Sequence, residues 1–396
     1  MIKGSALAVP LSLHESYGFF YPVLFDKFGT YRTGIRGGKG IEMEFIPMRG
    51  RTLPEDLALR DFTINTLTMR PTGPSTFEIT DTLGSALTDI GKRIIRTPID
   101  PWKTISDDPL RSMRAVRFSC TLSMEIELPL GETVRKLSSL LNHVAPERVR
   151  DELFVVLLSD VPSKGLKLMR ELGLLEVVMP EILPMIGFDQ RSPYHKDELF
   201  THSLTVMDRT HPSLETRLAA LFHDAGKPQS MQSSPGKVSY YGHQDVSAAL
   251  FGSFAGRLKL PRSVTETAGA LIRRHMVNYA PAWKDSTIRK FIRNNGAILD
   301  QLMDLYAADA GSLADPTGPL NMVEELAGRI QQQHVEEISN IESPLDGNAI
   351  QRLLGIAPGP KIGEIKRAII DAILEGVLEP TQPATEAFVR NKFAKG

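Results

Sequence analysis

A change in hydrophobic period near residue 105 is the strongest constraint on the fold of this 396-residue chain. Before it, β-rich runs at 31–35 and 41–46 flank the glycine-rich stretch 36–40, which is typical of a hairpin, and 77–80 predicts a third strand. After it, apolar residues recur at helical spacing almost to the C-terminus. The pattern predicts an α+β protein, with a small mixed-sheet head followed by an elongated α-helical body.

Local signals refine the helical part. Asp107, Asp108 and Pro109 combine an N-cap acid with a proline in the first turn, which predicts a helix start. Prolines in 180–195 predict a joint between units. Further helices are expected over 147–158, 164–172, 218–222 and 365–374, and loops over 229–239 and 357–363.

Composition excludes several protein classes. With 42% hydrophobic and 23% charged residues, the chain is a globular protein rather than a disordered one. The 46 basic and 47 acidic residues nearly cancel, so any contact with nucleic acid requires a local basic patch. The single cysteine, Cys120, excludes a disulfide framework and a cysteine-rich metal site. No apolar run approaches the roughly 20 residues that span a bilayer, so we expect a cytoplasmic protein with no membrane partner.

One helix flank is unusually basic. Arg111, Arg114 and Arg117 recur every three residues, which keeps neighbouring guanidinium groups close together. An anionic partner such as a phosphate chain would relieve their repulsion, and arginine forms forked hydrogen bonds to phosphates and base edges. A solvated helix whose arginines pair with Asp107, Asp108 and Glu147 fits the same spacing. Spacing alone leaves both interpretations open.

Four ordered segments resemble motifs of the class II tRNA nucleotidyltransferase (CCA-adding enzyme) and bacterial poly(A) polymerase family, and the resemblance runs from about Phe28 to the C-terminus. Leu59 stands where the first motif has an arginine, and Ser85 where the second has a glycine. The matches are 59–65 to R-R-D-F-T-I-N, 81–89 to D-x-x-G-G-x-x-D-L, 107–111 to E-D-x-x-R and 147–152 to the neck-helix motif E-R-x-x-x-E.

This family extends RNA 3′ ends without a nucleic-acid template, so the resemblance implies CTP or ATP and a tRNA or other RNA 3′ end as partners. Asp108 and Arg111 match the pair that reads the base edge of the incoming nucleotide. The implied nucleotide- and RNA-binding residues are Arg60, Asp61, Asn65, Arg96, Asp108, Arg111, Arg114, Arg117, Glu147 and Arg148.

The family's G-G-x-x-R-D and D-x-D motif, which holds Mg²⁺ or Mn²⁺ for nucleotidyl transfer, has no match, and no D-x-D occurs in the chain. Glu42 and Glu44 share one strand face and could replace the pair, although a solvated face is the more common meaning. We therefore expect a truncated, incomplete nucleotidyltransferase-like head. Its completion by a separate polypeptide, by an upstream segment or by divergent acids such as these stays open.

A second constellation combines imidazole and carboxylate side chains, which suit divalent metals such as Ni, Mn, Mg, Zn or Fe. It consists of His202, His223, Asp224, His243, His275 and Asp309. The order resembles the H…HD…D layout of HD phosphohydrolases, and 218–227 is similar to their core signature. The resemblance implies phosphatase or 2′,3′-cyclic phosphodiesterase activity on nucleotides or RNA ends. His223 and Asp224 would be catalytic, and Lys227 or Arg274 would neutralise phosphate charge.

The expected domains are a nucleotidyltransferase-like head over 1–97, a neck of nucleotide- and RNA-binding helices over 98–185, an HD domain over 186–335 and a helical tail over 336–396. Three functions stay open. The first is tRNA 3′-end processing, with independent polymerisation in doubt because D-x-D is absent. The second is metal-dependent HD hydrolysis, with the head and neck as a binding platform. The third is a non-catalytic tRNA-binding subunit.

Overall fold

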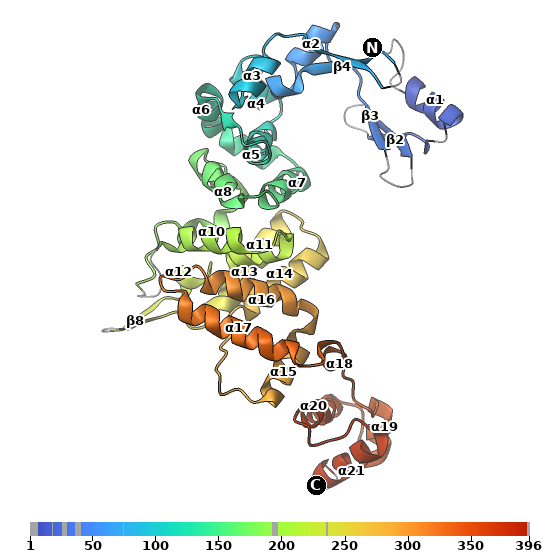
Figure 1. Cartoon of the computed structure of the whole chain (residues 1–396), viewed down its shortest axis with the longest axis vertical. Coiled ribbons are helices and arrows are strands. Elements are labelled where there is room, and N and C mark those ends of the chain that lie inside the picture. The colour runs from blue at the N-terminus through green and yellow to red at the C-terminus, as the bar shows by residue number, and fades with distance from the viewer. Residues whose placement is uncertain are drawn as a thin grey trace. The chain divides into compact units, whose positions relative to one another are not determined.

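A computed structural model describes residues 7–17, 19–25, 30–35, 41–73, 75–191, 197–234 and 237–393. The chain divides into two compact units. Unit 1 comprises residues 1–119 and 123–137, and unit 2 comprises residues 120–122 and 138–396 (Figure 1). Strands are concentrated in unit 1 and helices dominate unit 2, which confirms the predicted α+β class. Among the described helices, none combines the length and apolar character that a bilayer crossing requires.

Unit 1 begins with α1 (Ala8–Tyr17) and an antiparallel sheet of order β1-β2-β3. Its strands are β1 (Val23–Phe25), β2 (Thr30–Ile35) and β3 (Ile41–Phe45). The pairing of β2 with β3 confirms the predicted hairpin, although its turn, 36–40, lies outside the described residues. Arg32 lies opposite Glu44 in this register and forms an ion pair with it.

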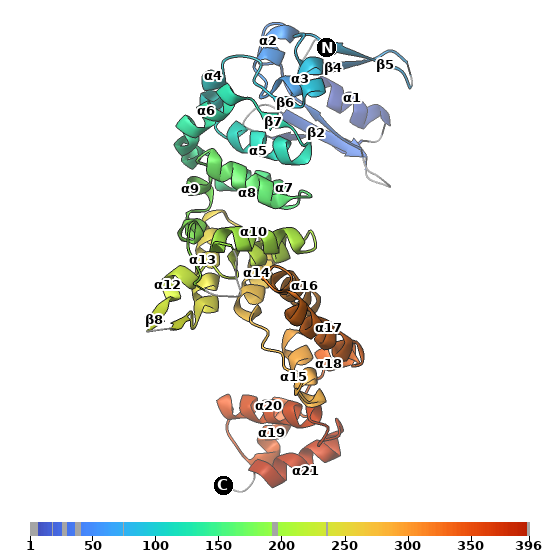
Figure 2. The same cartoon turned by 60° about the vertical axis from the view of Figure 1, so that its left-hand side comes forward.

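The rest of unit 1 carries two further small sheets. The predicted strand at 77–80 is confirmed as β5, which pairs with β4 in an antiparallel ribbon (Figure 2). β6 and β7 pair in parallel. The elements are α2 (Leu53–Ala58), η1 (Thr63–Asn65), β4 (Leu67–Pro71), β5 (Phe77–Asp81), α3 (Ala86–Lys92), β6 (Ile94–Ile95), α4 (Pro101–Asp107), α5 (Arg111–Thr121), β7 (Glu125–Ile126) and α6 (Leu128–Leu137).

The helix start predicted at 107–109 is confirmed, with Asp108 rather than Asp107 as the capping acid. Asp107 is instead the last residue of α4, and Asp108 is extended, with φ −147° and ψ 97°. A residue that precedes proline is sterically disfavoured in the α region, so the chain leaves the helix at this point. The Asp108 carboxylate accepts the N–H of Leu110 at 3.2 Å, and α5 then begins at Arg111.

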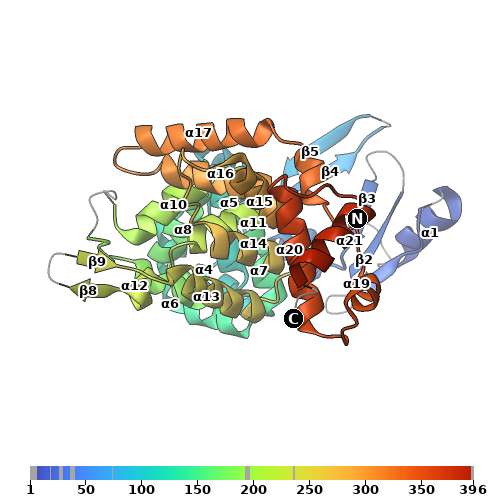
Figure 3. The ribbon, with the colours of Figure 1, turned by 90° about the horizontal axis from the view of Figure 1, so that it is seen from below.

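Unit 2 contains the remaining elements, including the helices predicted over 147–158, 164–172, 218–222 and 365–374. In Figure 3, α17 lies alongside α16. The elements are η2 (Ser138–His143), α7 (Pro146–Leu157), α8 (Pro162–Glu171), α9 (Leu175–Val178), η3 (Pro180–Met185), α10 (Leu199–Arg209), α11 (Leu214–Phe222), α12 (Lys227–Ser230), β8 (Gln232–Ser234), β9 (Lys237–Ser239), α13 (His243–Arg257), α14 (Arg262–Arg274), α15 (Asp285–Asn295), η4 (Gly296–Ile298), α16 (Leu299–Ala310), α17 (Thr317–Gln331), α18 (Val335–Ser339), α19 (Gly347–Leu354), α20 (Pro360–Leu374) and α21 (Gln382–Phe393).

Two expected loops are wrong in part. Within 229–239, β8 and β9 form an antiparallel hairpin, which the sequence hides because its short strands lack alternating apolar residues. Within 357–363, Pro360 already begins α20. Proline is well suited to a first helical position, where its fixed φ matches the helix and its missing N–H costs nothing.

A buried arginine joins α7 to α11, the helix that ends just before His223. Arg217 is 4% exposed, and its Nη1 donates to the carbonyl oxygens of Leu157 and of Ser159, the latter at 2.7 Å. Because both acceptors lie at or just after the end of α7, one side chain satisfies carbonyls that the helix end leaves unpaired. These hydrogen bonds hold α11 against the end of α7, and α11 leads directly into His223 and Asp224.

We expect Arg217→Met to lower the free energy of unfolding by about 2 kcal/mol or more, since it leaves two buried carbonyl oxygens without their donor. Arg262→Met is the matched control, because Arg262 is exposed and pairs with the exposed Glu266 across one helical turn. Urea unfolding followed by circular dichroism measures both. Equal, small effects of the two substitutions would contradict the structural role of Arg217.

Candidate metal centre

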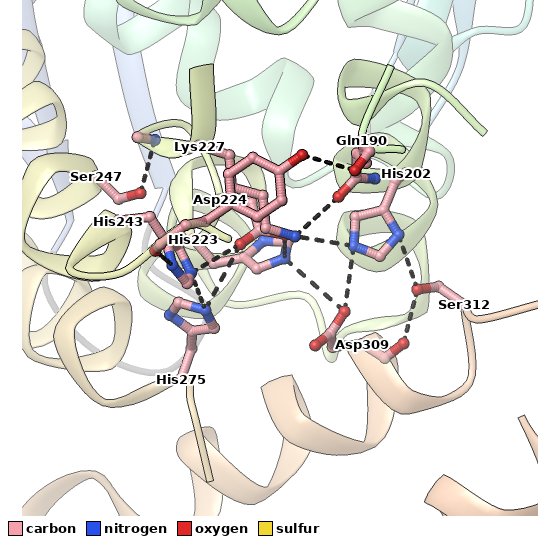
Figure 4. A network of polar contacts seen from close by, with 12 residues as sticks. Gln190, His202, His223, Asp224, Lys227, His243, Ser247, His275, Asp309 and Ser312 are labelled. Atoms are coloured by element: carbon pink, nitrogen blue, oxygen red, sulfur yellow. Dashed lines mark hydrogen bonds and ion pairs between the residues drawn. The ribbon is translucent and has the colours of Figure 1, made fainter. Parts of the chain in front are cut away.

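Four histidines and two aspartates that lie far apart in the sequence converge at one centre in unit 2 (Figure 4). The side chains come from five helices or their ends. They are His202 in α10, His223 and Asp224 directly after α11, His243 at the start of α13, His275 directly after α14 and Asp309 in the last turn of α16. The fold therefore brings together all six residues of the predicted HD series.

Asp224 lies in the middle of this cluster. Its Oδ2 is 3.1 Å from His223 Nε2, and its Oδ1 is 3.1 Å from His243 Nε2 and 3.7 Å from His275 Nε2. His202 Nε2 is 3.8 Å from Asp224 Oδ2. The side chains thus form two groups with metal-ligand spacing, His202–His223–Asp224 and Asp224–His243–His275, which share the Asp224 carboxylate.

Backbone carbonyls fix the orientation of three imidazole rings. In His223, His243 and His275, Nδ1 lies 2.7, 2.8 and 2.8 Å from the carbonyl oxygen three residues earlier. A carbonyl oxygen only accepts, so each Nδ1 carries a proton, and in the neutral ring the lone pair is on Nε2. Each Nε2 faces Asp224, so a cation at this point could bind the imidazoles and the carboxylate together.

Ser312 performs the same task for the fourth ring. Its hydroxyl donates to the carbonyl oxygen of Asp309 at 2.7 Å, so the serine oxygen accepts from His202 Nδ1 at 3.2 Å. This leaves the lone pair of His202 on Nε2, which is 3.2 Å from Asp309 Oδ1. Sequence reasoning did not select Ser312; its position three residues after Asp309 is the only signal it offered.

Burial and charge set the protonation of the cluster. Burial is the main cause that lowers the pKa of His275, to about 4, so this ring is neutral at pH 7. Burial acts to raise the pKa of Asp224, but His223 and Lys227 outweigh it and hold that pKa well below its usual value. For His223, burial opposes the charged form, yet Asp224 raises its pKa. Burial would also raise the pKa of Asp309, but the imidazoles of His202 and His223 lower it to about 2.

The cluster fits a divalent cation. Among the described residues, His223 Nε2 and Asp309 Oδ1 are buried atoms without a well-oriented hydrogen-bond partner. Leaving such atoms unsatisfied costs free energy, and a cation at the centre would satisfy them. Neutral imidazoles and ionised carboxylates are the ligands that Mn²⁺, Fe²⁺, Ni²⁺ and Zn²⁺ accept in proteins. Metal binding itself stays a prediction.

Lys227 is the cation that the structure places on this cluster. Its Nζ lies 2.6 Å from Asp224 Oδ2 and donates to Gln190 Oε1 at 2.8 Å. The other predicted candidate, Arg274, donates instead to the carbonyl oxygen of Asn294 at 2.6 Å and to Asn295. Gln190 was missed because it lies in the proline-rich stretch that the sequence marks only as a joint.

Comparisons with known proteins agree with this geometry. Residues 199–312 match the HD domain family, and residues 123–186 match the family described as "Probable RNA and SrmB- binding site of polymerase A". The A-adding tRNA nucleotidyltransferase of Deinococcus radiodurans is 32% identical over 88% of this chain and 81% of its own length. The chain belongs to the tRNA nucleotidyltransferase family.

Other members of the family give the same result. The CC-adding tRNA nucleotidyltransferase of Thermus thermophilus is 30% identical over 84% of this chain and 76% of its own. The solved structure of the Bacillus stearothermophilus CCA-adding enzyme in complex with CTP has a TM-score of 0.59, with 22% identity, and covers 91% of this chain and 81% of its own. At that identity the structural match establishes the fold, and the family follows from the sequence relatives.

The nucleotidyltransferase motif at 59–65 is held by a polar network in unit 1. The Asp61 carboxylate accepts from Arg114 Nη2 at 2.7 Å and from Asn65 Nδ2 at 2.9 Å. Burial would raise the pKa of Asp61, but Arg114 and Asn65 lower it. Arg114 therefore pairs with Asp61 of the motif, and this pairing differs from both interpretations of the arginine flank.

Arg111 is buried in the same unit. Its guanidinium donates to the carbonyl oxygens of Leu59, at 2.8 Å, and Thr104, at 3.3 Å. These bonds tie the start of α5 to the motif. Its predicted contact with a base edge stays untested, as does that of Asp108, whose carboxylate caps the turn before α5.

The other predicted nucleotide- and RNA-binding residues have local partners. Arg96 pairs with Asp89 at 3.1 Å, and Asp89 accepts the hydroxyl of Thr63 at 2.7 Å, which anchors the motif from a second side. Arg60 pairs with Asp56 at 3.3 Å, and Arg117 lies over the Phe118 ring at 4.0 Å. Glu147 pairs with Lys259 at 2.6 Å, and Arg148 is the next residue of α7. Of the two candidate metal ligands in the head, Glu44 pairs with Arg32, whereas the side chain of Glu42 lies outside the described residues.

We expect Ser312→Ala to weaken Mn²⁺ binding by about tenfold, because a group that orients a histidine ligand typically contributes at least that factor. Ser263→Ala, on the exposed first turn of α14, is the control and should bind Mn²⁺ like the wild type. Isothermal titration calorimetry on the full chain measures both affinities. Unchanged affinity in Ser312→Ala would show that His202 needs no such orientation.

Proposed function

We propose that this chain processes tRNA 3′ ends and that its HD centre is a metal-dependent phosphohydrolase acting on RNA 3′ ends or nucleotides. One observation carries the HD activity: four histidines form two groups with metal-ligand spacing, two rings in each, and both groups share the Asp224 carboxylate. Family membership supports the substrate, because its relatives are named as tRNA nucleotidyltransferases. Both families use divalent metals.

The residues of the centre would have three roles in hydrolysis: to bind cations, to admit substrate and water, and to neutralise phosphate charge. His202, His223 and Asp224 would hold one cation, with Asp309 beside them, and Asp224, His243 and His275 a second. A bound divalent cation supplies Lewis-acid charge and lowers the pKa of a coordinated water. The Asp309 side chain is 31% exposed whereas Asp224 is buried, so substrate and water would enter beside Asp309. Lys227 would neutralise the phosphate oxygens.

The hydrolysis balances without any further reactant. The oxygen of water forms a bond to phosphorus as the ester bond breaks, and the proton from water ends on the leaving oxygen. With a 2′,3′-cyclic phosphate, one of the two ring P–O bonds breaks and a phosphomonoester remains on the ribose. In either reaction the phosphate-bearing product is negatively charged, which gives the Lys227 ammonium a partner before and after the reaction.

Nucleotidyl transfer with CTP or ATP is the second candidate, and the network of Asp61, Asn65 and Arg114 favours it. In this family the residues that match Arg60, Asp61 and Asn65 hold the triphosphate and ribose, and here Asp61 and Asn65 are already hydrogen-bonded to each other. Mg²⁺ or Mn²⁺ would need carboxylates such as Glu42 and Glu44, or a separate polypeptide that supplies the D-x-D motif. Glu44 would have to leave its ion pair with Arg32 to serve as a ligand.

With Mn²⁺ or Ni²⁺ added, we expect the wild-type chain to hydrolyse p-nitrophenyl phosphate and 2′,3′-cyclic AMP, and Asp224→Asn to reduce kcat at least a hundredfold. The reason is that Asp224 is shared by both ligand groups. Asp245→Asn, on the exposed side of α13, is the matched control. Elemental analysis that finds no bound metal in the wild type, or full activity in Asp224→Asn, would exclude the HD proposal.

For the head, we expect Asp61→Asn to weaken CTP and ATP binding by about tenfold, because losing the charge releases Arg114 from its position beside Asn65. Glu78→Gln, in the exposed ion pair of the β4–β5 ribbon, is the control. Fluorescence titration with labelled nucleotides measures the affinity. Equal affinities in both variants would remove the nucleotide-binding role of the network.

Incorporation of labelled CTP and ATP into tRNA that lacks CCA separates the three functions. Addition by the purified chain with Mg²⁺ or Mn²⁺ supports independent polymerisation. Failure to add nucleotides leaves the HD hydrolase or a completing polypeptide. Tight, salt-sensitive tRNA binding with neither activity supports the non-catalytic subunit.

A further inference from the structure

Three groups from separate segments of unit 2 surround the Lys227 ammonium. Asp224 Oδ2 lies at 2.6 Å and Gln190 Oε1 at 2.8 Å (Figure 4). The centroid of the Tyr240 ring lies at 5.7 Å. Two of these groups are neutral. Gln190 is 2% exposed and belongs neither to the metal ligands nor to the residues that the HD signature contains.

Gln190 is held in place independently of Lys227. The Tyr240 hydroxyl donates to the Gln190 carbonyl oxygen at 2.6 Å, while the Tyr240 carbonyl oxygen accepts from His243 Nδ1 at 2.8 Å. The next residue, Arg191, has a left-handed φ of 47°, and its N–H donates to the Asp189 carboxylate at 2.8 Å. Such a backbone is strained for a non-glycine residue and persists only where its surroundings fix it.

The amide of Gln190 has one possible orientation. An ammonium group only donates, so the carbonyl oxygen must face Lys227. In this orientation Gln190 Nε2 is buried and has no hydrogen-bond partner among the described residues. An apolar side chain of similar size would fill the same space without the cost of an unsatisfied donor. The interaction with Lys227 is therefore the feature that a glutamine provides here.

We propose that Gln190 is a positioning residue for Lys227, an inference that rests on the proposed hydrolase function. Asp224 Oδ2 now contacts the ammonium, but the same oxygen belongs to the metal-ligand group with His202 and His223. If His202, His223 and Asp224 held a cation, Asp224 would be shared with it and Lys227 would lose part of this ion pair. The hydrogen bond from Lys227 to the neutral Gln190 carbonyl oxygen keeps the ammonium beside the centre. There the ammonium can form an ion pair with a phosphate oxygen of the substrate.

The neutrality of Gln190 is essential to this role. A carboxylate at the same place would bind the ammonium as an ion pair, and it would also repel the incoming phosphate. A side chain with no acceptor would let the four-carbon stem of Lys227 swing away when the cation arrives. Glutamine is the common side chain that reaches this far and accepts a hydrogen bond without charge.

A double-mutant cycle tests the proposal through phosphate binding rather than turnover. The quantity measured is the dissociation constant of inorganic phosphate for the full chain loaded with Mn²⁺, by isothermal titration calorimetry. We expect Gln190→Met to weaken phosphate binding about tenfold. Lys227→Met should weaken it at least as much, and the double variant should bind phosphate no more weakly than Lys227→Met alone.

Gln229→Met is the matched control, since Gln229 lies exposed on α12, two residues from Lys227, and should leave phosphate affinity unchanged. Wild-type phosphate affinity in Gln190→Met would overturn the proposal. So would a double variant about tenfold weaker than Lys227→Met, because additive effects mean that Gln190 does not act through Lys227. Manganese content and the unfolding temperature are measured for every variant.

If Gln190→Met fails to fold or to bind Mn²⁺, the phosphate affinity of Gln190→Glu tests the proposal instead. It keeps an acceptor of the same length, and its charge should weaken phosphate binding at least tenfold; phosphate affinity equal to the wild type would overturn the proposal. A wild-type chain that binds no Mn²⁺ overturns the proposed hydrolase function together with this inference. A wild-type chain that binds Mn²⁺ and hydrolyses esters while the cycle is additive overturns the inference alone.

Discussion

The Asp224 carboxylate is the group on which the arrangement of the HD centre depends. A buried carboxylate is costly unless charges and donors surround it, and here four imidazoles and an ammonium lie within 4 Å of its oxygens. These side chains come from different helices. The helices must therefore pack in one way for the charge to be compensated, and that packing creates the ligand geometry.

Arg217 and Arg111 compensate buried backbone carbonyl groups as the imidazoles and the ammonium compensate Asp224. Each is a buried guanidinium that satisfies two carbonyl oxygens of other segments. In unit 2 this joins the end of α7 to the helix before His223, and in unit 1 it joins α5 to the motif at 59–65. Both units thus use arginine inside the protein to position the segments that carry their motifs.

Much of this could be read from the sequence. The order of His202, His223, Asp224, His243, His275 and Asp309 predicted a common centre, because each of these residue types is a metal ligand. The partners of that centre could not be predicted, because Gln190 and Ser312 act through contacts that no periodicity or spacing encodes. The helix start at 107–109 could be predicted for a local reason: Pro109 keeps Asp108 out of the α region, and an extended acid at that point is a capping residue.

The backbone carbonyls that orient the imidazoles have a consequence for stability within the native state. Those of Ala220 and Ile272 lie in the last turns of α11 and α14, where helices fray most readily. Each fraying event removes the acceptor of His223 Nδ1 or His275 Nδ1 and permits the other tautomer. The metal affinity of this centre is then a sensitive reporter of order at two helix ends, and hydrogen exchange at those ends should slow when a cation binds.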